Sequence, residues 1–147
     1  DVFQGLGQFI SENDTNLEFT YIGRFPEDVE RKGIKIIEPQ DDASLSKMIS
    51  EFDIYMTASL EEAGANHVLE GIAAGLPIVY RKNGGSIQEY CSRYGIEYDH
   101  NLQSLFSSIN KVASMYPLYK NMSMSYNENL EMSIDMYIDV IKGVMIE

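Results

Sequence analysis

The sequence predicts an α/β fold in which a parallel β-sheet is flanked by helices on both faces. Short segments rich in β-branched and aromatic residues alternate with segments of helical periodicity, and the connections between them are short. The chain has 147 residues, of which 44% are apolar, so it can bury the core of one domain. We therefore treat residues 1–147 as a single α/β domain.

The first part of the chain is predicted to contain three strands and two helices. Apolar residues at helical spacing indicate the first helix, although Gly5 and Gly7 lower its propensity. Asp42 or Ser44 can cap the second helix. The expected elements, in order, are a helix at 1–12, strands at 17–22 and 34–37, a helix containing Leu45, Met48 and Ile49, and a strand at 52–57.

The second part is predicted to be mainly helical, with one strand. Gly75 suits the position just after a helix C-terminus, and Pro77 can open a strand because the first strand residue can lack an amide donor. The expected elements, in order, are a helix at 66–74, a strand at 77–80, and helices at 86–94, 101–115 and 125–144.

Charge and composition exclude several classes of function. The net charge is −12 and the 11 Lys and Arg residues are scattered, which argues against a nucleic-acid partner. No apolar run approaches the ~20 residues of a membrane span. The single cysteine, Cys91, rules out an internal disulfide and favours a reducing compartment. We therefore expect a cytoplasmic domain.

The segment Ser59–Pro77 is the most informative part of the chain. In parallel α/β sheets, ligands bind beyond the carboxyl ends of the strands, and this segment follows a predicted strand. Free amides at the helix start near Asn66 can hold a phosphate or a sugar hydroxyl, and Gly64 permits close approach of the backbone. The carboxylates of Glu62 and Glu70 can accept hydrogen bonds from paired sugar hydroxyls.

These residues resemble a known signature. Glu62 and Glu70 are separated by seven residues and followed by Ala74-Gly75-Leu76-Pro77, with Gly84-Gly85 downstream. This pattern resembles the paired-glutamate motif of the GT-B retaining glycosyltransferases, particularly family 4. The resemblance implies a Rossmann-like sheet that forms the C-terminal, donor-binding half of a GT-B fold.

The resemblance also implies roles for individual residues. Glu70 would bind the ribose, and Glu62, the catalytic candidate, would contact the donor sugar. The remaining substrate-binding candidates are Gly64, Ala65, Asn66, Gly84 and Gly85. The nucleotide-sugar would be a substrate, and neither a metal nor another cofactor is expected.

Other interpretations remain open for single residues. Glu62 could favour only the positive end of the following helix, and Asn66 could be a simple N-cap. Gly84-Gly85 could be only a turn. Arg81 and Lys82 could reach a phosphate from a strand end, but a solvated turn is the favoured interpretation.

Three more predictions concern the two histidines and the cysteine. His67 and His100 are expected to be surface or cap residues, since neither has a partner at nucleophile or metal spacing. Cys91 is expected to be buried and inert.

Two features of the family are not found in this sequence. The family places an Arg and a Lys on the donor diphosphate upstream of the first helix, whereas residues 1–16 contain neither. An acceptor-binding N-terminal domain is not in this chain either. We therefore expect a piece of a two-domain enzyme that transfers a hexose-type sugar to a glycan or glycolipid, peripheral at the membrane, if at all, through its other half. This piece alone should be inactive and bind donor weakly.

Two alternatives use the same fold. One is a non-catalytic nucleotide-binding or interaction module, because fold does not fix function. The other is a sugar-nucleotide epimerase, which is less favoured because the sequence shows no added acid/base residues to serve it.

Overall fold

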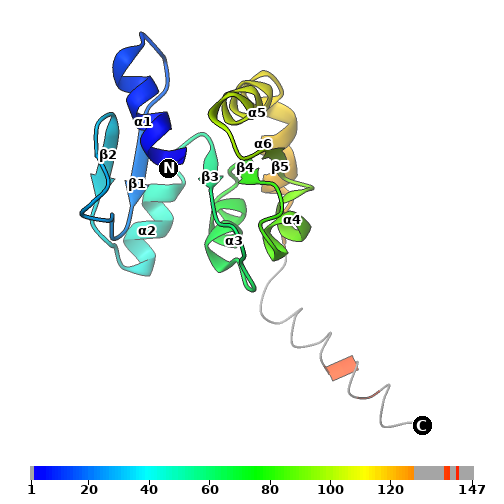
Figure 1. The fold of residues 1–147 in the computed structure, drawn as a ribbon. Coiled ribbons are helices and arrows are strands. Elements are labelled where there is room, and N and C mark those ends of the chain that lie inside the picture. Colours follow the sequence, from blue (N-terminus) through cyan, green and yellow to red (C-terminus); the bar gives the residue numbers. More distant parts are fainter. Residues whose placement is uncertain (1, 128–137, 140–141, 143–147) are drawn as a thin grey trace.

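The computed structural model describes residues 2–127, 138–139 and 142, and its strands all run parallel to their hydrogen-bonded neighbours (Figure 1). The strands form a two-stranded sheet, β1-β2, and a three-stranded sheet, β3-β4-β5. Helices lie against both sheets, so the predicted α/β class with parallel strands and flanking helices is confirmed. In the described ranges no helix has both the length and the apolar character needed to cross a bilayer.

The first sheet and its helices form the N-terminal region. Its elements are α1 (Val2–Glu12), β1 (Phe19–Ile22), β2 (Ile34–Ile37) and α2 (Asp42–Ile49). The two glycines that weakened the helix prediction, Gly5 and Gly7, serve close packing, and a Cβ at Gly5 would lie 2.5 Å from Leu102 Cδ1. A Cβ at Gly7 would lie 2.4 Å from the carbonyl oxygen of Lys32, and Gly33 has a positive φ of +70° beside Gly7. Glycine lets helix and turn approach backbone to backbone.

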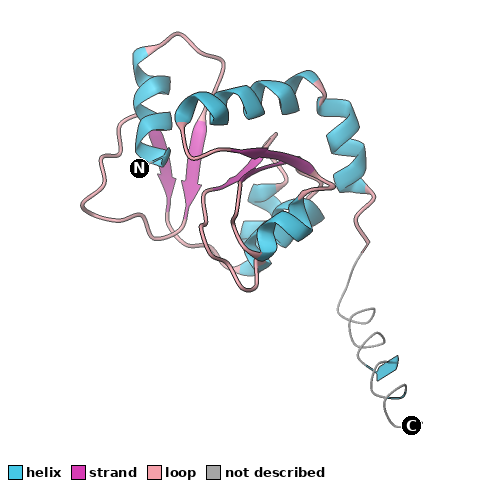
Figure 2. Cartoon of the chain, turned by 45° about the vertical axis from the view of Figure 1, so that its right-hand side comes forward, coloured by secondary structure: helices cyan, strands magenta, loops and turns pink. Residues whose placement is uncertain are grey.

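The second sheet and its helices form the C-terminal region. Its elements are β3 (Tyr55–Thr57), α3 (Asn66–Ala73), β4 (Ile78–Arg81), α4 (Ser86–Cys91), β5 (Gly95–Tyr98), α5 (Leu102–Ser114) and α6 (Tyr116–Met124). Figure 2 shows helices on both sides of this sheet.

Two buried clusters pack on the two faces of the three-stranded sheet, and the second also contains Leu6 of α1. Ile78 and Tyr80 of β4 pack with α3 and α4, whereas Val79 faces the other way and packs with Tyr98 and α5. This alternation follows from the two-residue period of a strand covered on both faces. Most of the core therefore lies around β4.

The structure corrects several predicted boundaries. The helix expected at 86–94 ends at Cys91, and β5 follows at Gly95–Tyr98 where no strand was predicted. Glycine is required there, because a Cβ at Gly95 would lie 1.7 Å from the carbonyl oxygen of Ile78.

Further corrections concern α2, α6 and the end of the chain. The N-cap of α2 is Asp41, whose carboxylate accepts from the amide of Ser44 at 2.9 Å, and not Asp42 or Ser44. The predicted elements also do not include α6. The helix expected at 125–144 falls largely outside the described residues.

Candidate functional site

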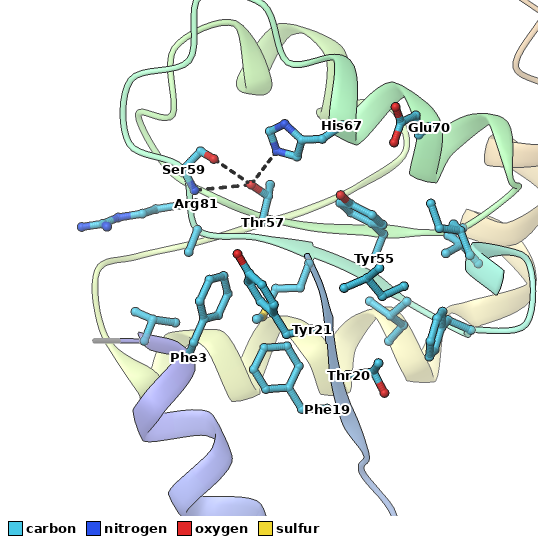
Figure 3. A pocket seen from close by; sticks show the side chains of 18 of the residues that line it. Phe3, Phe19, Thr20, Tyr21, Tyr55, Thr57, Ser59, His67, Glu70 and Arg81 are labelled. Carbon is cyan, nitrogen blue, oxygen red and sulfur yellow. Dashed lines mark hydrogen bonds between the residues drawn. The ribbon is translucent and has the colours of Figure 1, made fainter. Parts of the chain in front are cut away.

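A cavity of about 1220 Å³ separates the two sheets. β1 and β3 form its long walls, and Glu62, Glu70 and Arg81 line it at the side of the C-terminal region. Figure 3 shows Tyr55 and Glu70 toward one end of the cavity, and Ser59 and Arg81 toward the other end, beyond the end of β3. The cavity runs along the strands and reaches their carboxyl ends, where parallel α/β proteins bind ligands.

The loop that carries Glu62 is held by backbone hydrogen bonds. The amide of Glu62 donates to the carbonyl of Gly84 at 3.3 Å, and its own carbonyl accepts from the amide of Ser86 at 3.0 Å. The Ser86 hydroxyl donates to the same carbonyl at 2.8 Å. Glu62 and Gly85 form a parallel bridge, for which Gly85 adopts φ +72°. The Gly84-Gly85 turn therefore positions Glu62 and is more than a simple connection.

Helix α3 carries the second glutamate. Its N-cap is Ala65, which is fully buried, and Asn66 is the first helical residue. The structure thus rules out Asn66 as the N-cap. Glu70 lines the cavity on the same helix face as His67.

The seven predicted site residues are close in the fold but differ in exposure to the cavity. Glu62 and Glu70 line it directly. The other five build the loop, the helix start and the turn beside it, and are Gly64, Ala65, Asn66, Gly84 and Gly85. Nothing lies within 4 Å of a Cβ built on Gly64, so its backbone faces open space. Ligand roles for all seven stay predictions.

A cluster of three polar side chains was not predicted. The Thr57 hydroxyl is buried and lies 3.1 Å from His67 Nε2 and 3.3 Å from Ser59 Oγ. His67 is half-buried, lines the cavity and is the second residue of α3, so it is not a helix cap. The spacing of three residues between His67 and Glu70 was the available signal, because such residues share a helix face. His100, the other histidine expected at the surface or at a cap, is exposed.

Arg81 and His100 meet at the carboxyl ends of β4 and β5. Arg81 Nε donates to His100 Nδ1 at 2.7 Å, and both side chains line the cavity. Lys82, the next residue, instead lies 4.0 Å from Glu97 and 3.9 Å from Asp99. The two adjacent cations therefore have different surroundings: Lys82 is paired with acidic residues and Arg81 with a histidine.

Tyrosine hydroxyls in and beside the cavity remain protonated at neutral pH. Burial, helped by the charge of Glu70, raises the pKa of Tyr55 to about 12. Burial also raises the pKa of Tyr98, whose hydroxyl lies 3.4 Å from the carbonyl oxygen of Thr57 and donates to it. Both groups are hydrogen-bond donors at pH 7.

Cation-binding groups do not cluster in the part of the chain that the structure describes. No set of three or more His, Cys, Asp or Glu side chains there is arranged to hold a metal ion. The expectation of a site without metal or other cofactor stays a prediction.

Comparison with known proteins gives a structural match. No protein-family model matches the chain, and no curated protein sequence matches it. The crystal structure of WaaG, a glycosyltransferase involved in lipopolysaccharide biosynthesis, matches 77% of this chain with a TM-score of 0.57 and 20% sequence identity. The chain covers 32% of the length of WaaG. It therefore has the fold of part of a glycosyltransferase, a Rossmann-like arrangement of parallel strands and flanking helices.

Proposed function

We propose that this chain is the donor-binding domain of a retaining glycosyltransferase and binds a nucleotide-sugar in the cavity at the carboxyl ends of β3 and β4. The observation that carries the proposal is the convergence of Glu62 and Glu70 on one cavity. They come from different elements, a clamped loop and helix α3. The glycosyltransferase fold supports the same conclusion.

The two carboxylates suit two different parts of the donor. Glu70 would accept hydrogen bonds from the ribose hydroxyls, and Glu62 would accept them from the donor sugar, since hydrogen bonds to a charged acceptor are the strong ones. The Gly84-Gly85 turn holds the Glu62 loop before the ligand arrives. A loop fixed in advance costs less ordering entropy on binding and positions the sugar for transfer.

The first measurement compares glutamine variants in a ligand titration. Glu70→Gln should weaken nucleoside diphosphates and their sugars by about 10- to 100-fold, because it removes a charged acceptor. Glu62→Gln should weaken the nucleotide-sugar by a similar factor but leave the free diphosphate nearly unchanged. Glu61→Gln is the matched control, because Glu61 is an exposed neighbour that does not line the cavity.

The outcome that would refute the proposal is specific. If neither Glu62→Gln nor Glu70→Gln weakens binding more than Glu61→Gln does, the cavity is not the donor site. If the nucleotide binds but the whole protein transfers no sugar, the chain is a binding module with this fold.

The activity of the whole protein is part of the same proposal. A domain that holds the donor needs a second domain to hold the acceptor, and we propose a glycan or glycolipid acceptor and a hexose-type sugar. The reaction would take place in the cytoplasm. This chain alone should bind the donor without transferring its sugar. An assay that follows radiolabelled sugar from donor to acceptor can test this by comparing this chain with the whole protein.

A further inference from the structure

Arg81 is a cation in a cavity that three carboxylates also line. Among the described residues that line the cavity, Arg81 is the only Lys or Arg, whereas Glu18, Glu62 and Glu70 are acidic. No ion pair joins Arg81 to any acidic residue within the described ranges. Its neighbour Lys82 has two acidic neighbours. Arg81 is half-buried as a residue, and an arginine without a counter-ion among the described residues is suited to an anionic ligand.

The hydrogen bond from Arg81 fixes how its guanidinium is presented. The Nε donates to His100 Nδ1, which leaves the donors of the two terminal nitrogens for a ligand. In Figure 3 the Arg81 side chain extends beyond Ser59, past the carboxyl end of β3 and away from Glu70. In a nucleotide-sugar the diphosphate joins the ribose to the sugar. A ligand whose ribose meets Glu70 and whose sugar meets Glu62 would therefore hold its phosphates between those two residues, in the cavity that Arg81 also lines.

We infer that Arg81, positioned by His100, binds the diphosphate of the nucleotide-sugar. The inference rests on the proposed function and adds to it a phosphate-binding cation within this chain. It also replaces the interpretation of Arg81 as part of a solvated turn. Lys82 does not share this role, because Glu97 and Asp99 occupy its surroundings.

The experiment compares ligands with and without phosphate. Dissociation constants for UDP, GDP and ADP, and for uridine, guanosine and adenosine, are measured with the wild-type chain, Arg81→Gln and Lys82→Gln. Arg81→Gln should weaken the diphosphate by about 10- to 100-fold and change nucleoside binding by less than about twofold, because only the phosphate contact is lost. Lys82→Gln loses the same charge and should weaken the diphosphate by less than about threefold, since exposed charges are screened.

A second variant tests the geometry of the contact. Arg81→Lys keeps the charge but loses the planar fork of donors, so it should bind the diphosphate between wild type and Arg81→Gln. In the wild-type chain, the ¹⁵Nε–H resonance of Arg81 should shift with the diphosphate and not with the nucleoside. This measurement does not depend on any variant folding.

The outcomes separate the two claims. If no nucleotide or nucleoside binds the wild-type chain, the proposed function fails and the inference fails with it. If diphosphate and nucleoside bind equally well, or if Lys82→Gln matches Arg81→Gln, the inference alone is overturned. An Arg81 resonance that stays fixed while the diphosphate saturates the site overturns it as well.

Discussion

The two regions of this molecule differ in how completely they bury their strands. In the C-terminal region three of the four residues of β4 are buried, whereas no residue of β1 is. The largest fully buried side chains all lie between Val68 and Ser123. Within the described part of the chain, the sheet of the N-terminal region has two strands, and β1 has a hydrogen-bonded partner strand on one side only.

This difference shows how the candidate site is built. Glu62, Glu70 and Arg81 all belong to the densely packed region, which can hold them in fixed positions. The N-terminal region provides the opposite wall of the cavity through β1. Packing density governs local stability, so we expect the N-terminal region to open first and the residues of the site to remain in place.

The largest expected effect is a contrast between two leucine truncations. Leu105→Ala removes a fully buried side chain of the C-terminal region and should lower the free energy of unfolding by about 2–5 kcal/mol. Leu45→Ala removes the same atoms from a half-buried residue that already borders the cavity, and it should cost less than about 1.5 kcal/mol. Urea denaturation measures both, and equal losses would contradict the contrast between the regions.

A pair of glycine substitutions separates stability from ligand binding. Gly85→Ala places a Cβ 2.6 Å from the Glu62 carbonyl oxygen at a residue with φ +72°, so it should cost about 1–3 kcal/mol of stability. Gly64→Ala meets nothing within 4 Å and should leave the melting temperature unchanged. If the donor approaches the Gly64 backbone, the same change should weaken nucleotide-sugar binding. A Gly64→Ala variant that binds as well as wild type would place the ligand elsewhere.

The smallest expected effect is a loss of stability at alkaline pH. Burial raises the pKa of the Cys91 thiol from 9.0 to about 12, so the folded state keeps a proton that the unfolded state releases. The stabilisation is present below pH 9 and is lost as pH rises from 9 to 12. Between pH 8 and 10 the loss should be about 1 kcal/mol, and Cys91→Ala should flatten that part of the profile. Burial also raises the pKa of Tyr55 and of Tyr80 to about 12. Above pH 10, the wild type and Cys91→Ala should therefore both continue to lose stability.

Local sequence signals predicted the elements that are determined by their own residues and not by contacts with distant parts of the chain. The strand at 34–37 and the end of α3 just before Gly75 agree with the structure, because a β-branched run and a glycine mark them locally. β5 escaped prediction because Gly95 is required by contact with Ile78, which lies 17 positions away in sequence. The strands β1 and β3 belong to different sheets because of tertiary packing, and no sequence pattern within either strand indicates this separation.

In the candidate site, too, local sequence patterns predicted some residues but not the contacts between distant parts of the chain. The spacing of Glu62 and Glu70 is a local pattern, and it placed both residues on one cavity. The partnership of Arg81 with His100 joins the ends of two neighbouring strands, 19 residues apart, so no local spacing indicates it. The three-residue spacing of His67 and Glu70 was visible in the sequence but carried no meaning until the cavity was known.

The most direct test of the central claim, that a nucleotide-sugar binds at the carboxyl ends of β3 and β4, is an NMR titration of this chain with UDP, GDP and ADP and their common sugars. We predict selective amide shifts at residues 64–70 and at Gly84-Gly85, largest for the base that the protein prefers, with the amides of α5 and α6 unchanged. Shifts confined to other parts of the chain, or none up to millimolar ligand, would contradict the claim for this chain.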